Sequence, residues 1–271
     1  LLLLPAELRL QIYNHFFSST PFTYGKLNQM APASNHLAIL RSCRLINREI
    51  DDSWLGQVLF AFENVTDLLN QLSPAPRRMI EQIRRVRVGS SPLTQSIGDG
   101  QETTYKLPWA LDLIPGLYLD TLTVINTDGP ELAYENVNYL IRFGSGWREL
   151  HFITGNSEML AFPRRSIEHN ETTQFQWRDP QPSTWIRDLA FRDHVHSDAF
   201  VKIYRSTQSN APGSVMDPNS REVFEQKPPS PENSEFFGID KDAQLMHPDE
   251  IGKELLVIVR RGKDVDISAD E

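Results

Sequence analysis

Cysteine is almost absent from this sequence, since Cys43 is the only one among 271 residues. A single cysteine excludes an intramolecular disulfide and favours a reducing compartment, so we expect the protein in the cytoplasm or the nucleus. The sequence also lacks any run of about 18 apolar residues, the length that a membrane-spanning helix requires. Because it has no phosphate-binding loop, dinucleotide fingerprint or Gly-x-Ser-x-Gly motif, we expect no cofactor and no enzymatic activity.

Basic residues are scarcer than acidic ones, and the net charge of −9 is unevenly distributed. Residues 1–90 carry +3, whereas residues 91–205 carry −5 and residues 206–271 carry −7. An acidic chain without a long basic stripe is a poor ligand for duplex nucleic acid, because neutralised phosphates supply most of that affinity. One basic cluster lacks interleaved aromatics and is interpreted as a solvated surface. It comprises Arg77, Arg78, Arg84, Arg85 and Arg87.

Two helices are predicted in the first part of the chain. Residues 1–17 read "LLLLPAELRLQIYNHFF", in which Pro5 suits a first helical turn and Leu8, Ile12 and Phe16 recur every four residues. Residues 18–36 contain two prolines and a glycine and are predicted to form a loop. A second continuous helix is predicted over "LAILRSCRLINREIDDSW", with an apolar stripe on one face. The stripe comprises Leu40, Cys43, Ile46, Ile50 and Trp54.

The pattern changes to alternating strands and helices after residue 57. The segment "VLFAFE" predicts a half-buried strand, and three helix-then-strand units follow over residues 65–154. Strands joined by helices favour a parallel arrangement. We therefore predict an α/β fold in which a helical pair leads into an α/β body, with a mostly parallel sheet that is leucine-rich-repeat-like or mixed.

Four regions are predicted from these composition changes. They are a helical region at 1–57, the α/β body at 58–205, a flexible linker or excursion loop at 206–235, and a returning strand with an acidic tail at 236–271. The linker is predicted because this segment is rich in proline and serine and poor in large apolar residues. The strand is predicted from "KELLVIVRRG".

Metal-binding residue types gather once, in "RDHVHSD" at 192–198. His194 and His196 would share one face of a strand, which suits two ligands, but no third ligand has convincing spacing. We therefore predict no metal, and a metal-dependent hydrolase around His194 and His196 stays an alternative. The segments "GSGW" at 144–147 and "GDGQE" at 98–102 are interpreted as a helix stop and a surface turn, and Cys43 is interpreted as a packing residue.

The first 65 residues resemble the F-box and, more closely, a large group of fungal F-box-like proteins. The shared features are an "LPxELRxxIY" opening, an "LLxxCRxIxxE" second helix and a phenylalanine-rich strand. In this chain they read "LPAELRLQIY", "ILRSCRLINRE" and "VLFAFE". The long segment at 18–36, and Ile46 where an aromatic residue is common, depart from the F-box pattern.

The resemblance implies a non-enzymatic interaction protein that recruits substrates to a cullin–RING ubiquitin ligase through a Skp-type linker protein. It places the partner-binding surface on Leu4, Pro5, Leu8, Ile12 and Tyr13, with Leu40 from the second helix. In the alternative interpretation, the helical pair is a structural cap, or the chain is a structural subunit of a larger assembly whose neighbour covers the opening leucines.

Overall fold

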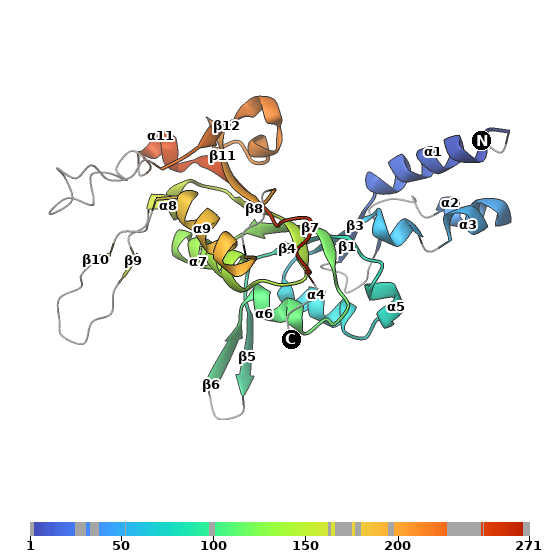
Figure 1. The fold of residues 1–271 in the computed structure, drawn as a ribbon, viewed down its shortest axis with the longest axis horizontal. Coiled ribbons are helices and arrows are strands. Elements are labelled where there is room, and N and C mark those ends of the chain that lie inside the picture. Colours follow the sequence, from blue (N-terminus) through green and yellow to red (C-terminus); the bar gives the residue numbers. More distant parts are fainter. Residues whose placement is uncertain are drawn as a thin grey trace. The chain divides into compact units, whose positions relative to one another are not determined.

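The computed structural model shows an α/β protein with a mixed sheet (Figure 1). It describes residues 3–24, 31–32, 38–51, 53–97, 101–161, 164–165, 175–176, 180–194, 198–226, 245 and 247–267. The chain divides into two compact units. Unit 1 comprises residues 1–124, 144–149 and 266–271, and unit 2 comprises residues 125–143 and 150–265.

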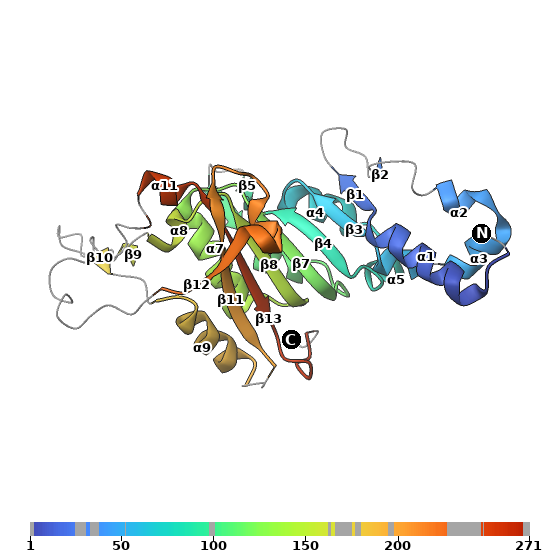
Figure 2. The same ribbon diagram turned by 90° about the horizontal axis from the view of Figure 1, so that it is seen from above.

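Unit 1 contains a helical N-terminal part followed by strands and short helices (Figure 2). Its helices are α1 (Ala6–Ser18), α2 (Ala38–Ser42), α3 (Arg44–Ile50), η2 (Ser53–Gly56), α4 (Val65–Leu72), α5 (Arg77–Ile80) and α6 (Leu107–Asp112). Its strands are β1 (Pro21–Tyr24), β2 (Ala31–Pro32), β3 (Leu59–Phe62), β4 (Arg85–Gly89), β5 (Leu93–Ile97), β6 (Gln101–Tyr105) and most of β7 (Leu119–Asn126).

The strand order in unit 1 is β7-β4-β3-β1-β2, with β3 parallel to both β1 and β4. The predicted strand "VLFAFE" is confirmed as β3, and β4, within "IRRVRVG", is the strand of the first predicted helix-then-strand unit; Phe60, Val86 and Val88 are buried. Helix α4 is capped by Asn64, whose side chain accepts a hydrogen bond of 2.9 Å from the Asp67 amide. This helix contacts β3 and β4 and covers part of the sheet.

The segment at 18–36 differs from the predicted loop, because residues 21–24 form β1. This strand pairs in parallel with β3, from Pro21 beside Leu59 to Tyr24 beside Phe62. It is short and bounded by Pro21 and Gly25, so its apolar pattern was too brief to identify it as a strand. The β5–β6 hairpin was likewise not predicted, and the "GDGQE" segment lies partly outside the described residues.

The predicted second helix is interrupted at Cys43, whose extended backbone separates α2 from α3. Two side chains compete with the helical hydrogen bonds at this point. The Ser42 hydroxyl donates to the Ile39 carbonyl at 2.7 Å, and the Asn47 side-chain amide donates to the Leu40 carbonyl at 3.1 Å. The break redirects the chain, so the stripe predicted for one long helix does not form a single face.

Unit 2 contains adjacent strands of the sheet and several helices (Figure 2). The strand order is β12-β11-β13-β8, with β11 (Phe200–Ser209) antiparallel to both β12 (Arg221–Phe224) and β13 (Lys253–Arg260). β8 (Trp147–Thr154) begins in unit 1 and ends in unit 2. The other elements are α7 (Pro130–Phe143), α8 (Glu158–Ala161), β9 (Arg164–Arg165), β10 (Phe175–Gln176), α9 (Ser183–Arg192), η3 (Ser214–Met216), η4 (Pro218–Ser220) and α11 (Pro248–Ile251).

The first part of the predicted linker is structured. Residues 206–224 continue β11, form η3 and η4, and return as β12. Buried Glu254 on β13 organises this turn, because its carboxylate accepts hydrogen bonds from the Gly213 amide at 2.8 Å and the Val215 amide at 3.1 Å. The composition of the predicted linker did not indicate this structure, because one distant carboxylate, that of Glu254, stabilises a segment that has few apolar residues of its own.

Cutting the chain at an engineered protease site between residues 227 and 244 is expected to leave the two fragments associated. Seven residue pairs between β11 and β13 join the sequence before the cut to the sequence after it, and buried β-strand pairing of this kind does not depend on the connecting chain. The measurement is size-exclusion chromatography of the cut protein without denaturant. Separate elution of the C-terminal fragment would contradict this prediction. A site engineered after Asp264 serves as the control, because a cut there leaves β11 and β13 on the same fragment.

Candidate functional site

A partly buried polar bridge joins α1 to α3 in unit 1. The Arg9 guanidinium donates from Nε to Glu49 Oε2 at 3.0 Å and makes a second contact with Glu49 Oε1. The Tyr13 hydroxyl donates to Glu49 Oε2 at 3.2 Å. Bidentate pairing between arginine and carboxylate fixes orientation as well as distance. The bridge therefore sets how the exposed sides of the two helices are presented together.

The electrostatics of this bridge favour its charged form. Hydrogen bonding from Arg9 lowers the pKa of Glu49 below its ordinary value, and the same contact raises the pKa of Arg9. Burial, together with the hydrogen bond to Glu49, raises the pKa of Tyr13. The carboxylate and guanidinium thus stay ionised and Tyr13 stays neutral around neutral pH.

The sequence-predicted surface residues divide between exposed and buried positions. Leu8 and Ile12 lie one helical turn apart and are 45% and 42% exposed, while Leu4 and Pro5 are exposed just before α1. Tyr13 is only 2% exposed, so its assignment to the partner-facing surface is wrong. It lies on the inner face of α1, because its spacing from Phe17 matches the buried side of the helix.

Further exposed apolar residues lie nearby and were not predicted. Leu10 on α1 is 43% exposed and Leu45 on α3 is 46% exposed. We define the helix-pair surface as Leu4, Leu8, Ile12 and Leu45; Leu10 lies seven residues before Phe17 and therefore on the other side of α1. Leu45 could not be placed from the sequence, because a helix that continued through Cys43 would have given it a different direction. Leu40 is half-buried and lines a pocket beside this surface.

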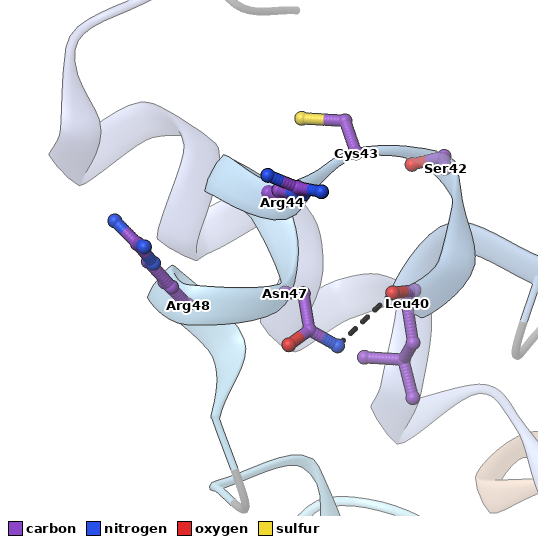
Figure 3. A pocket seen from close by; sticks show the side chains of 6 residues that line it. All are labelled: Leu40, Ser42, Cys43, Arg44, Asn47 and Arg48. Carbon is purple, nitrogen blue, oxygen red and sulfur yellow. Dashed lines mark hydrogen bonds between the residues drawn. The ribbon is translucent and has the colours of Figure 1, made fainter.

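The pocket lies at the junction of α2 and α3 and has a volume of about 390 Å³ (Figure 3). The figure shows the hydrogen bond that joins Asn47 to Leu40 across the junction. Cys43, interpreted as a core residue from the sequence, is partly exposed here because the helix breaks at this residue. The lining residues are Leu40, Ser42, Cys43, Arg44, Asn47 and Arg48.

The basic cluster at 77–87 has structural contacts. Arg84 donates to the Tyr118 carbonyl at 2.8 Å, Arg85 donates to the Gln57 carbonyl at 3.2 Å, and Arg77 pairs with Glu81 at 2.8 Å. Side chains that bridge backbone segments of unit 1 are less available to an external polyanion. The arrangement of these arginines agrees with the interpretation of the basic cluster as part of the protein's own surface.

The "RDHVHSD" segment is organised around Asp193, at the end of α9. Its carboxylate receives two hydrogen bonds from Arg261, at 2.9 and 2.8 Å, and one from Arg192 at 3.0 Å. His194 follows with a positive φ of 58°, which ends the helix, and His196 lies outside the described residues. Within the described ranges, no three His, Cys, Asp or Glu side chains come together as a candidate metal site.

A scan against protein-family profiles, a search of curated proteins and a search of solved structures each return no match.

In the part of the chain that the structure describes, no helix has the length and apolar character needed to cross a membrane. The "GSGW" segment follows α7, and Gly146, with φ 73°, connects the helix to β8.

Proposed function

We propose that this chain is a non-enzymatic protein-interaction module whose N-terminal helix pair binds a Skp-type linker protein. In this role it would be a substrate-recognition adaptor of a cullin–RING ubiquitin ligase, with the α/β part of the chain contacting the substrate. The observation that carries the proposal is the helix-pair surface, where apolar side chains on α1 and α3 are exposed beside the Arg9–Glu49 bridge. Clustered exposed apolar residues mark interaction sites more reliably than isolated ones.

The energetics of this surface suit a protein interface. Full burial of a leucine or isoleucine side chain contributes about 1.5–3 kcal/mol, and covering the exposed part of a few such residues supplies a useful share of a binding free energy. The bridge between Arg9 and Glu49 holds α1 and α3 together before any partner arrives. A preorganised surface loses less conformational entropy on binding, which leaves more of the burial energy as affinity.

Leu8→Asp is expected to abolish co-elution of the purified protein with a Skp-type linker during size-exclusion chromatography at micromolar concentration. A carboxylate at this position would have to be desolvated against an apolar partner surface. Leu113→Asp is the matched control, because Leu113 is also exposed in unit 1, at 55%, but lies outside the helix-pair surface. The control should still co-elute, and far-UV circular dichroism should be the same for both variants.

Two results would contradict the proposal. One is the absence of a complex between the wild-type protein and the linker, and the other is an equal loss of binding in Leu113→Asp. The first would favour the structural-subunit alternative, in which a different neighbour covers the helix-pair surface. A native pull-down with the full chain would then identify that neighbour.

A second candidate function, as a subunit of a larger assembly, is favoured by unit 2. Helices α7 and α9 contact each other, and both carry exposed apolar residues. Phe143 on α7 is 52% exposed and Phe191 on α9 is 87% exposed. Light scattering of the purified protein distinguishes self-association through this region from a monomer that needs a different partner.

A further inference from the structure

The pocket between α2 and α3 has an unbalanced positive charge. Arg44 and Arg48 are exposed, lie one turn apart on α3 and both line the pocket. Neither forms an ion pair with any acidic residue that the structure describes, whereas Arg9 in the same helix pair is neutralised by Glu49. Two neighbouring like charges repel each other and are stabilised when an anion lies between them.

The remaining polar groups of the pocket are already engaged within the protein. The Ser42 hydroxyl donates to the Ile39 carbonyl and the Asn47 amide nitrogen donates to the Leu40 carbonyl. The two guanidinium groups are therefore the strongest groups left to bind a ligand. Leu40 lines the same pocket, and exposed Leu45 follows Arg44 directly on α3. The site thus combines two cations with an apolar margin.

We infer that this pocket binds carboxylate side chains of an acidic segment of the partner protein that contacts the helix-pair surface. The inference rests on the proposed function and names the chemistry of its partner. Arginine pairs with carboxylates in a planar, two-bond geometry, and Leu40 and Leu45 suit apolar residues between the acidic ones. Arg44 and Arg48 supply the positive charge at the pocket itself, and complementary charge favours an acidic partner there.

Cys43 provides a direct measurement of whether the pocket is covered. It lines the pocket, is partly exposed and is the only cysteine of the chain, so a thiol reagent labels one position. The rate of Cys43 alkylation by iodoacetamide should fall about tenfold when a saturating Skp-type linker is added. Co-elution with the linker at an unchanged alkylation rate would overturn the pocket inference and leave the proposed function intact.

A second arm tests the pocket without the linker. The probe is a short fluorescein-labelled peptide of Glu, Leu and Ser, and its binding to the 271-residue chain is measured by fluorescence anisotropy. We expect binding that weakens as salt is raised, and about tenfold weaker binding of the counterpart with Gln in place of Glu. Equal binding of the two peptides would overturn the inference, and so would tighter binding of a counterpart carrying phosphoserine at the Glu positions.

The variant for both arms is Arg44→Glu/Arg48→Glu, which should weaken acidic-peptide binding at least about tenfold. Arg77→Glu/Arg78→Glu is the control, because it makes the same change of charge at exposed positions on α5 of the same unit. Should the reversal disturb folding, Arg44→Gln/Arg48→Gln removes the charge more mildly. Equal effects of the pocket and control variants would overturn the inference. Slower Cys43 alkylation at higher concentrations of the protein alone would also overturn the inference, because a second copy of the chain would then occupy the pocket.

Discussion

Replacing Asp193 with alanine is expected to lower the free energy of unfolding by about 3–5 kcal/mol, the range for removing one partner of a buried ion pair. The Asp193 side chain is 2% exposed and that of Arg261 is 7% exposed. Without the carboxylate, the buried Arg261 guanidinium just after β13 would lose its two hydrogen bonds to Asp193. Urea denaturation followed by circular dichroism measures the change.

Asp188→Ala is the matched control for this prediction. Asp188 is also on α9, but it is 22% exposed and its contact with Arg142 is longer, at 3.7 Å. Partly exposed pairs contribute about 0–1 kcal/mol, so the control variant should remain close to wild type. A loss in Asp193→Ala that is no larger than in the control would show that the buried pair does not stabilise unit 2.

The pH dependence provides an independent check of the same ion pair. Burial alone would raise the pKa of Asp193, but hydrogen bonds from Arg261 and Arg192 lower it below its ordinary value. A carboxyl whose pKa is lower in the folded state stabilises the protein above its unfolded pKa, and this contribution is lost as the pH falls through the folded pKa. The difference in stability between wild type and Asp193→Asn should therefore be largest near neutral pH and shrink in acid.

Phe17→Ala is the second substitution with a large expected effect, a loss of about 3–5 kcal/mol. The Phe17 side chain is fully buried, and its ring centroid lies 6.2 Å from that of Trp54. Trp54 in turn lies 5.5 Å from Phe22 on β1, which contacts Phe60 on β3. Truncating the Phe17 side chain leaves a cavity where α1 packs against the rest of unit 1. Thermal and urea denaturation measure the loss.

Tyr13→Phe serves as the control, because it keeps the ring and removes only the hydroxyl that donates to Glu49. A single hydrogen bond of this kind contributes about 0.5–1.5 kcal/mol. Leu8→Asp should leave stability almost unchanged, since Leu8 is exposed on the opposite flank of α1. Equal destabilisation by Leu8→Asp and Phe17→Ala would mean that both faces of α1 are packed, which would contradict the helix-pair surface.

Local signals in the sequence were sufficient for most of the helices and strands. Asn64 begins α4 because its side chain satisfies an amide of the first turn, and the alternation in "VLFAFE" and "IRRVRV" identifies β3 and β4. Helical spacing also places Leu8 and Ile12 on one side of α1, although the spacing alone does not show that this side is exposed. These features depend on residues within a few positions of each other, so the local sequence specifies them.

Only the tertiary structure decided the features that depend on distant residues. Glu49 lies 40 residues from Arg9, and Glu254 lies 41 residues from Gly213, yet each carboxylate determines how a whole segment is held. Tyr13 donates to Glu49 from the inner face of α1, and the pocket at Cys43 exists because Ser42 and Asn47 end a helix that the apolar pattern would have continued. Hydrogen bonds between remote groups leave no periodic trace in a sequence, so neither the direction of α3 nor the pocket beside it could be read from composition or spacing.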